Sequence, residues 1–251
     1  MLSKNKIKLI NSLKIKKYRE KHGFFVSEGL KSNEEFLKAG FVPVIAVITD
    51  EANKFPAFSP KTEIIKVSST KMKKVSNFKT PSDLLVVYKM QKVSYSQDDI
   101  SNNVCLFCDD IQDPGNFGTI LRTAAWFGIR HVFCSHQTVD VYNHKVIQAS
   151  MGATASISVH YVDASEFLTE QIKNSIPVAG ACLDGENIYQ TKLPKNALIV
   201  AGNEGKGISP NVSKFLTQRL HIPHFSDKAS KPESLNVSIA TAIICSEFKR
   251  R

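Results

Sequence analysis

The stretch AGNEGKGIS, residues 201–209, places three glycines, a glutamate and a lysine directly after the apolar run NALIV. A glycine-rich turn after a strand leaves backbone N–H and C=O groups open to a ligand. The glycine spacing fits neither the G-x-x-x-x-G-K-[ST] of phosphate-binding P-loops nor the G-x-G-x-x-G of dinucleotide-binding folds. The stretch predicts a ligand-binding turn of another kind.

A second loop with suitable chemistry, QDPGNFGTILRTAAWFG, follows the apolar run CLFCDDI. Its Asp-Pro-Gly sequence at 113–115 is typical of a turn, and Asn116 is expected to cap the helix that follows. Arg122 lies off the apolar stripe of that helix, about a turn and a half from its start. A single helical arginine is more often a solvated charge than a catalytic group.

A third loop, PHFSDKASKPE, follows LHI and leads into SLNVS, which opens a strongly apolar helix. Ser234 fits a simple N-cap. Asn236, expected inside the first turn, is less easily explained by folding, because asparagine is a weak helix former that prefers caps.

The elements that must position these loops alternate strand and helix through residues 103–251. This pattern predicts a mostly parallel sheet with helices on both faces. Ligands of such sheets bind beyond the carboxyl ends of the strands, where all three loops begin. The predicted strands are NVCLFCDDI, HVFCS, ISVHYV, PVAGACL, NALIVAG and RLHIPH.

Residues 1–93 form a smaller α/β module, and the polar stretch at 94–102 is its expected linker to the second module at 103–251. A basic amphipathic helix is predicted over residues 3–21, because apolar residues recur there at near-helical spacing. Further helices are predicted at LKSNEEFLKAG and STKMKKVSN, and strands at FFVSEG, VIAVIT, KTEIIKVS and DLLVVYKM.

The positive charge lies entirely in the first module. Residues 1–93 carry 19 Lys and Arg against 8 Asp and Glu, and the remaining residues carry 14 against 15. This asymmetry favours a polyanion-binding module, with nucleic acid as its partner. A merely solubilising surface is the alternative.

The five cysteines, an odd number, and the absence of a secretory signal predict reduced thiols in the cytoplasm. No apolar run has the length of a membrane helix. Cys105 and Cys108 lie within one predicted strand, where residues three apart point to opposite faces. We therefore assign them a structural role and predict no metal site.

The order of the three loops resembles the SpoU-type, or TrmH-like, RNA 2′-O-methyltransferases of the SPOUT superfamily. The matching segments are DPGNFGTILRTAAWFG (113–128), GNEGKG (202–207) and IP followed by SLNVS (222–238). The resemblance covers residues 103–251. KKYREKHGFFVSEG in the first module is similar to the family's substrate-binding domain, with a structural role expected for Glu28.

The resemblance implies an α/β fold whose C-terminal segment forms a trefoil knot, S-adenosylmethionine as methyl donor, and a homodimer that completes the active site. It places Gly202, Ile222 and Leu235 around the cofactor, mainly through backbone atoms. The partner would be RNA, ribosomal RNA rather than transfer RNA.

The implied reaction methylates a ribose 2′-hydroxyl, and the matching catalytic residues are Arg122, Asn116, Glu204, Ser234 and Asn236. A guanidinium is a poor base. We therefore expect Arg122 to clamp the acceptor's phosphate and developing oxyanion, while the proton leaves to phosphate or water. The other four residues would orient Arg122, the nucleotide or the cofactor.

Two features depart from the family pattern. The segment 224–233 is longer and more polar than in relatives, and His224 stands where an apolar residue is common. Three alternatives remain at this level: a transfer RNA methyltransferase of the same family, an RNA-binding protein without activity, and a nucleotide-dependent oxidoreductase. The last is disfavoured because no dinucleotide-type glycine turn follows CLFCDDI.

Overall fold

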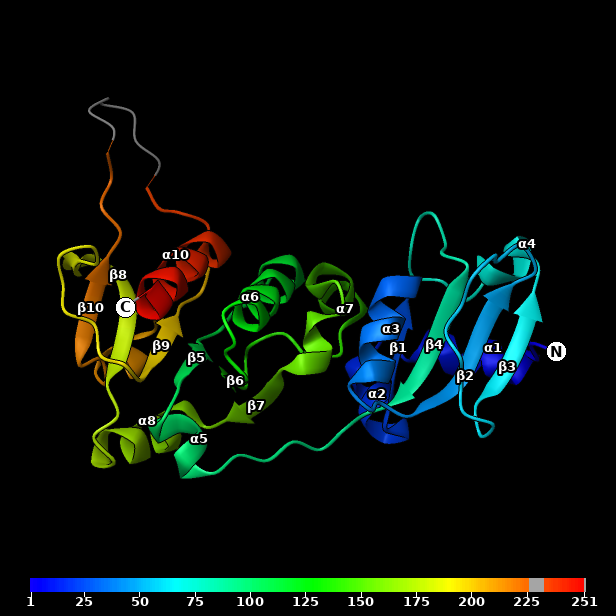
Figure 1. Ribbon diagram of the computed structural model, residues 1–251, viewed down its shortest axis with the longest axis horizontal. Helices are drawn as coiled ribbons and strands as arrows, with labels where there is room; N and C mark the ends of the chain where they lie inside the picture. The colour runs from blue at the N-terminus through cyan, green and yellow to red at the C-terminus, as the bar shows by residue number, and fades with distance from the viewer. Residues whose placement is uncertain (226–232, 251) are drawn as a thin grey trace. The chain divides into compact units, whose positions relative to one another are not determined.

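The computed structural model describes residues 1–225 and 233–250, which form two compact units (Figure 1). The N-terminal unit contains residues 1–92 together with 140–156, and the C-terminal unit contains 93–139 and the described part of 157–251. Residues 140–156 therefore lie inside the predicted second module in sequence but pack with the first unit. The predicted module boundaries at 93 and 103 stay a prediction.

The N-terminal unit is built on a mixed four-stranded sheet with the order β1-β4-β2-β3. Its strands are β1 (Phe24–Glu28), β2 (Pro43–Thr49), β3 (Glu63–Val67) and β4 (Leu84–Lys89). β4 is antiparallel to both β1 and β2, whereas β2 and β3 are parallel. Its helices are α1 (Lys4–Ser12), α2 (Lys16–His22), α3 (Leu30–Lys38), α4 (Ser69–Met72) and α7 (His144–Ser150), with the short 3-10 helix η1 (Ala153–Ser156).

The helix predicted over residues 3–21 is wrong as a single element, because it breaks into α1 and α2. Ile15 adopts an extended conformation at φ −103° and ψ 129°. The break exposes the carbonyls of Leu13 and Lys14, and the Arg19 guanidinium donates to both at 2.9 and 3.0 Å. Arg19 is only 2% exposed and also forms an ion pair with Asp140. The apolar periodicity does not reveal this buried arginine.

The segment 140–156 completes the core of the N-terminal unit. The Tyr142 ring stacks on Phe25 with 4.5 Å between ring centroids, and Ile147 belongs to the same buried cluster. Gly152 lies against α3, where an added Cβ would come within 3.1 Å of Glu35. This segment is thus as much a part of the N-terminal core as β1 is.

The C-terminal unit contains a six-stranded sheet with the order β10-β8-β9-β5-β6-β7, and every neighbouring pair is parallel. The strands are β5 (Val104–Cys108), β6 (His131–Ser135), β7 (Ser158–Val162), β8 (Val178–Asn187), β9 (Ala197–Ala201) and β10 (Gln218–His221). The predicted α/β class, with its mostly parallel sheet and smaller N-terminal α/β unit, is confirmed. The knot stays a prediction.

Helices cover both faces of this sheet (Figure 1). On one face α6 packs against α10, and on the other the buried side chains of α5, α8 and α9 share a core cluster with β5 and β9. These helices are α5 (Gln97–Ser101), α6 (Pro114–Trp126), α8 (Ala164–Lys173), α9 (Pro210–Ser213) and α10 (Val237–Arg250).

The polar stretch at 94–102 contains α5 rather than irregular chain. Ser96 and Asp99 form a reciprocal capping box, which makes a five-residue helix stable at this position. Across the described residues, no helix is long and apolar enough to span a bilayer. The five cysteines are all free, and Cys105 and Cys108 are both buried in β5.

Candidate active site

The carboxyl ends of β5, β9 and β10 lie at one edge of the C-terminal sheet, and a loop leaves each of them. The strand order changes direction between β5 and β9, since β6 and β7 follow β5 on one side while β9, β8 and β10 lie on the other. Such a switch point is where parallel sheets open a crevice for ligands. The three loops singled out in the sequence therefore meet at this edge.

The glycine loop folds back on itself. Asn203 and Gly207 form an antiparallel bridge, with each backbone N–H donating to the other's carbonyl at 2.9 Å. An added Cβ at Gly202 would lie 2.4 Å from the Gly207 carbonyl carbon, and Gly207 has a positive φ of 69°. Glycine is thus required at Gly202 by the close approach of the two arms of the loop, and at Gly207 by its left-handed backbone conformation.

Asn203, which the sequence analysis missed, holds this loop in place. Its side-chain oxygen accepts from the N–H groups of Gly205 and Lys206 at 3.0 Å, and its Nδ2 donates to the Asp110 carbonyl at 2.7 Å. An asparagine that bonds to backbone two residues on is a usual turn former, so its place in GNEG was a usable signal. A second anchor is the buried Asp109, whose Oδ2 accepts from Ser209 N at 2.7 Å.

Glu204 links the glycine loop to the loop before α6. Its carboxylate accepts from Asp113 N at 3.1 Å, from Asn116 Nδ2 at 3.2 Å and from Gln112 N at 3.4 Å. An acidic side chain at a helix N-terminus is favoured by the exposed N–H groups and the helix dipole. Glu204 therefore stabilises the first turn of α6 from a different loop.

Asn116 then carries the connection to the last helix. Its Oδ1 accepts from Asn236 Nδ2 at 2.9 Å, while its own Nδ2 donates to the Glu204 carboxylate. The three side chains form one continuous hydrogen-bonded chain across the three loops, which we call the loop node (Glu204, Asn116, Asn236). The structure thus brings these three predicted site residues into direct contact.

Two predicted helix caps are wrong. Asp113 caps α6, with its side chain accepting from Asn116 N at 2.7 Å, so Asn116 occupies the first turn and its side chain is free for the node. The final helix begins at Val237, three residues after Ser234. Asn236 precedes it and acts as its cap, because its Oδ1 accepts from Ser238 N at 2.9 Å. The preference of asparagine for caps explains this position.

A cavity of about 360 Å³ opens beside the loop node. It is lined by the glycine loop, by the middle of β8, by the end of β10 and by the entrance of α10. All three residues predicted to hold the cofactor, Gly202, Ile222 and Leu235, line this cavity, as do Glu204 and Ser234. Cys182 also faces it, and burial raises the pKa of this thiol, so it remains protonated and is not an activated nucleophile.

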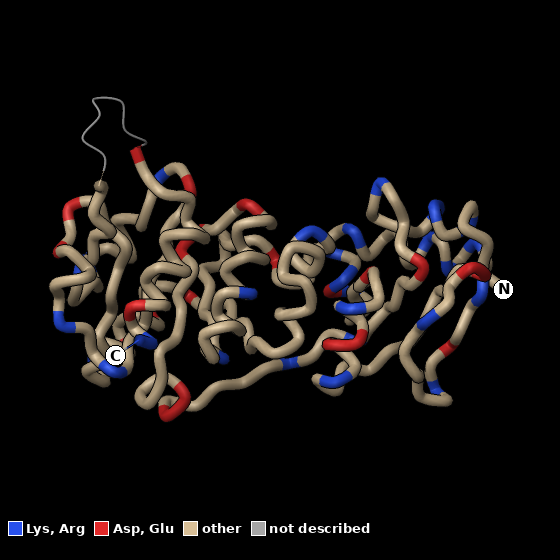
Figure 2. The backbone as a smooth tube through the Cα atoms, turned by 45° about the horizontal axis from the view of Figure 1, so that its top comes forward, with Lys and Arg blue, Asp and Glu red and all other residues tan. Residues whose placement is uncertain are grey.

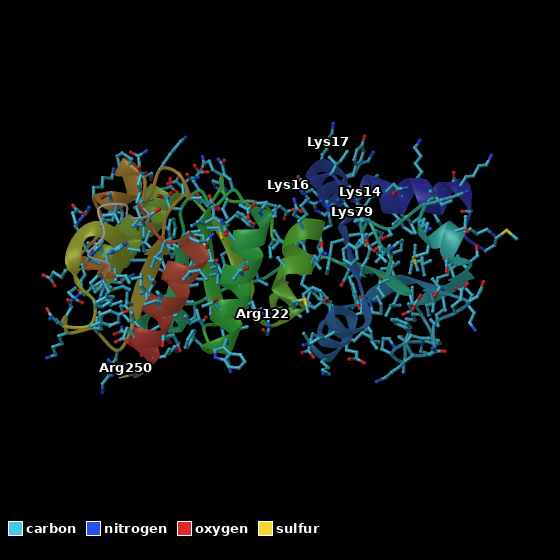
Figure 3. All side chains as sticks on the ribbon, turned by 90° about the horizontal axis from the view of Figure 1, so that it is seen from above. Lys14, Lys16, Lys17, Lys79, Arg122 and Arg250 are labelled. Atoms are coloured by element: carbon cyan, nitrogen blue, oxygen red, sulfur yellow. The ribbon has the colours of Figure 1, made fainter. Side chains whose placement is uncertain are left out.

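Arg122 does not join this group. It is exposed on α6, and within residues 1–225 and 233–250 no hydrogen bond or ion pair of its side chain is found. Six residues along an α-helix place Arg122 about 9 Å further along the axis than Asn116 and about a third of a turn around it. Figure 3 shows Arg122 on α6. Trp126, one turn further on the same helix face, is 85% exposed.

Two departures from the family pattern fall on or beside residues that the structure does not describe. The longer segment at 224–233 includes residues 226–232, which lie outside the described residues. His224 is exposed next to them. Among the residues that the structure describes, no group of three or more His, Cys, Asp or Glu could hold a metal ion.

Comparisons with known proteins agree with this geometry. The SpoU rRNA Methylase family profile matches residues 103–246, and the MRM3-like substrate binding domain profile matches residues 4–86. The 23S rRNA (guanosine(2553)-2′-O)-methyltransferase RlmP of Bacillus subtilis is 28% identical over 242 residues, 95% of this chain and 94% of that protein. Mitochondrial rRNA methyltransferase 3 of Xenopus laevis is 33% identical over 155 residues, 58% of this chain and 37% of that protein.

Solved structures give the same result. A TrmH-family protein from Porphyromonas gingivalis has a TM-score of 0.87 and 38% identity, covering 100% of this chain and 99% of its own. The SpoU methyltransferase AviRb of Streptomyces viridochromogenes, solved with AdoMet, has a TM-score of 0.83 and 20% identity, covering 99% of this chain and 98% of its own; it shares the fold. The resemblance drawn from the three loops is confirmed: with its profile matched over more than half of the chain, this protein belongs to the SpoU rRNA methylase family.

Proposed function

We propose that this protein transfers the methyl group of S-adenosylmethionine to a ribose 2′-hydroxyl of ribosomal RNA. The observation that carries the proposal is the loop node beside the cavity. The node joins three distant segments of the chain through Glu204, Asn116 and Asn236. Folding alone does not require these residue types at these positions. Family membership and the 2′-O activity named for the Bacillus subtilis relative support the same reaction.

The residues present fit S-adenosylmethionine. The cavity of about 360 Å³ is in the usual size range of small-molecule sites. Its wall combines apolar side chains, such as Ile222 and Leu235, with the backbone of the glycine loop, which offers donors and acceptors to the adenine and amino-acid parts. Gly202, Ile222 and Leu235 would hold the cofactor, which supplies an already activated methyl group on a sulfonium.

The chain's residues then have to position the acceptor and manage one proton. Asn116 and Asn236 hold the mouth of the cavity in one geometry, and Glu204 and Ser234 present polar groups to the nucleotide or the cofactor. Arg122 clamps the acceptor's phosphate and the negative charge that develops on the 2′-oxygen, because its guanidinium donates in a fixed fork. The hydroxyl proton leaves to phosphate or water, since a guanidinium is a poor base.

The RNA-binding role is assigned to residues 1–93, with 94–102 as linker and 103–251 as the catalytic domain. Figure 2 shows Lys and Arg distributed over the N-terminal unit, which holds the whole of the excess positive charge. Contacts between lysine or arginine side chains and RNA phosphates give affinity without base specificity. Ribosomal rather than transfer RNA is favoured by the family description and by the 23S rRNA activity named for the Bacillus subtilis relative.

The functional unit in this proposal is a cytoplasmic homodimer. Arg122 and Trp126 lie exposed on α6, and Ile239 on the adjacent α10 is 51% exposed. Exposed apolar side chains on two adjacent helices suit a contact with a second copy of the chain. In the dimer, Arg122 of one protomer is directed to the cavity of its partner, which explains why its side chain has no hydrogen bond or ion pair among the described residues of its own chain.

The proposal is tested by incubating the purified protein with tritiated S-adenosylmethionine and deproteinised ribosomal or transfer RNA. Incorporation into ribosomal RNA at a 2′-O position, mapped by primer extension, is the expected result. Incorporation into transfer RNA alone would show that the substrate is transfer RNA instead of ribosomal RNA. Binding of ribosomal RNA with no incorporation would contradict the enzymatic role.

A further inference from the structure

The N-terminal unit carries a small polar hollow that neither its fold nor the active site explains. The hollow has a volume of about 10 Å³ and lies between the loop before β4 and helix α7. Its lining includes Glu28, Asn77, Phe78 and His144. Two of these lining residues carry a buried polar atom, Asn77 Oδ1 and His144 Nδ1, that has no hydrogen-bond partner among the described residues. Buried polar atoms are normally paired, so this pair indicates a missing partner.

The loop that forms one wall of the hollow is held rigidly. Glu28, at the end of β1, accepts from Ser76 Oγ at 2.5 Å and from Asn77 N at 2.7 Å. Ser76 Oγ in turn accepts from Phe78 N at 3.0 Å. This gives Glu28 the structural role expected from the sequence, and it fixes the direction in which Asn77, Phe78 and the following Lys79 face.

Four exposed lysines gather around the hollow, and we call them the lysine rim (Lys14, Lys17, Lys79, Lys145). Lys145 follows His144 of the hollow wall in α7. Burial lowers the pKa of His144, and the charges of Lys145, Lys14 and Arg19 lower it further. Lys79 follows Phe78 of the hollow wall. Figure 3 shows Lys14, Lys17 and Lys79 on one side of the N-terminal unit.

Three lysines of this unit outside the rim lie next to an acid. Lys6 pairs with Glu63, Lys38 with Glu35, and Lys16, next to the rim, lies 3.8 Å from Glu20. For the four rim lysines, no ion pair is found within the part of the chain that the structure describes. Unpaired like charges held close together repel one another and are stabilised when a polyanion binds.

We propose that the ribose–phosphate backbone of the RNA substrate lies across the lysine rim, with its phosphates on the four lysines and a ribose hydroxyl or its bound water over the hollow. The proposal rests on the proposed function, since it names the face on which that enzyme holds its RNA. The hollow has room for no more than about one water molecule, so it does not admit a nucleobase. The Glu28 carboxylate disfavours a phosphate inside it and leaves the phosphates to the rim.

The test compares two variants that remove the same charge from the same unit. The rim variant carries Lys14→Gln, Lys17→Gln, Lys79→Gln and Lys145→Gln, and the matched control carries Lys31→Gln, Lys54→Gln, Lys61→Gln and Lys66→Gln, four lysines that are also exposed. Binding to deproteinised 23S ribosomal RNA is measured by filter binding between 0.05 and 0.3 M salt, a range of about one decade. Circular dichroism and thermal unfolding verify that both variants fold.

For the rim variant we expect the slope of log affinity against log salt to fall by about 3, and the affinity at 0.1 M salt to fall by about 100-fold or more. The control should lose less than about a tenth of that effect, because its lysines contact no phosphate. Equal losses in both variants would show a non-specific charge effect and overturn the proposal, and so would unchanged binding in the rim variant.

Two further readouts separate this proposal from others. Binding to vesicles of anionic phospholipid is measured as well. If the wild type bound these vesicles, and the rim variant lost this binding but still bound RNA, the rim would be a membrane-binding surface instead. Methyl transfer is measured at saturating RNA, where the rim variant should keep a kcat within about 2-fold of the wild type while its KM for RNA rises. Absence of methyl transfer in the wild type would refute the proposed function and leave the binding result standing.

Discussion

The two halves of α6 differ in how the rest of the chain contacts them. At the first turn, Asn116 is hydrogen-bonded to both Glu204 and Asn236, so that three distant segments are joined. Further along the helix, Arg122 and Trp126 face solvent, and Trp126 is 85% exposed. One chain therefore forms the cavity lined by the glycine loop but leaves Arg122 exposed on α6. We propose from this difference that a second copy of the chain supplies Arg122 to the site.

A large loss of cofactor binding is expected when a side chain is placed in the glycine loop that lines the cavity. Gly202→Val would put side-chain atoms within 2.4 Å of the opposite arm of the loop, so that the arms cannot meet. We expect S-adenosylmethionine affinity, measured by isothermal titration calorimetry, to fall by about 100-fold or more, equivalent to about 3 kcal/mol.

The control for this variant is Gly205→Ala. An added Cβ there has no neighbour nearer than Asn203 Oδ1 at 3.8 Å, so cofactor affinity should be preserved. Equal binding by the Gly202→Val protein would show that the glycine loop does not form the cofactor site.

The role of the exposed half of α6 is tested by removing the Arg122 guanidinium. Arg122→Ala should lower kcat by about 100- to 1,000-fold, because the developing oxyanion loses its charged donor. Cofactor affinity should change by less than about 2-fold, since Arg122 does not line the cavity. Arg130→Ala, which removes another exposed arginine of the same unit, serves as the control. Near-normal turnover in Arg122→Ala would remove Arg122 from the mechanism.

We also predict self-association through the exposed face of α6 that carries Trp126. Trp126→Glu replaces an 85% exposed aromatic side chain with a charge, and in a dimer contact this should raise the dissociation constant by about 30-fold. Analytical ultracentrifugation over a concentration series measures the change. A wild-type protein that sediments as a monomer at micromolar concentration would show that this face is not a subunit interface.

The smallest expected effect concerns the loop node itself. Glu204 and Asn236 do not bond each other, but both bond Asn116. In a double-mutant cycle of Glu204→Gln and Asn236→Ala, we expect a coupling energy of about 1 kcal/mol in the free energy of unfolding, measured by urea denaturation. Strict additivity of the two changes would indicate that the node does not act as one network.

Much of the C-terminal unit could be predicted from the sequence, because buried parallel strands leave continuous apolar runs and their loops must start at one edge of the sheet. That rule alone brings Asn116, Glu204 and Asn236 to the same place. The choice between Asp113 and Asn116 as the cap of α6 could not be made, since both residue types are good caps and only the partner Glu204, far along the chain, decides between them.

In the N-terminal unit, several features could not be predicted from local sequence patterns. The break between α1 and α2 depends on Arg19, whose partner Asp140 lies 121 residues away. The membership of residues 140–156 in this unit likewise follows from packing of Tyr142 and Ile147 on a distant strand, which local periodicity does not encode. Asn203, in contrast, could have been found from its turn chemistry.

Subunit complementation gives a direct test of the proposal that Arg122 of one protomer completes the cavity of its partner. Chains carrying Gly202→Val and Arg122→Ala, each with a different affinity tag, are co-expressed, and the mixed dimers are isolated and assayed for methyl transfer to ribosomal RNA. We expect about half of the wild-type activity per mixed dimer, because one of its two sites is intact, while each variant alone is inactive. Mixed dimers as inactive as either parent would contradict it.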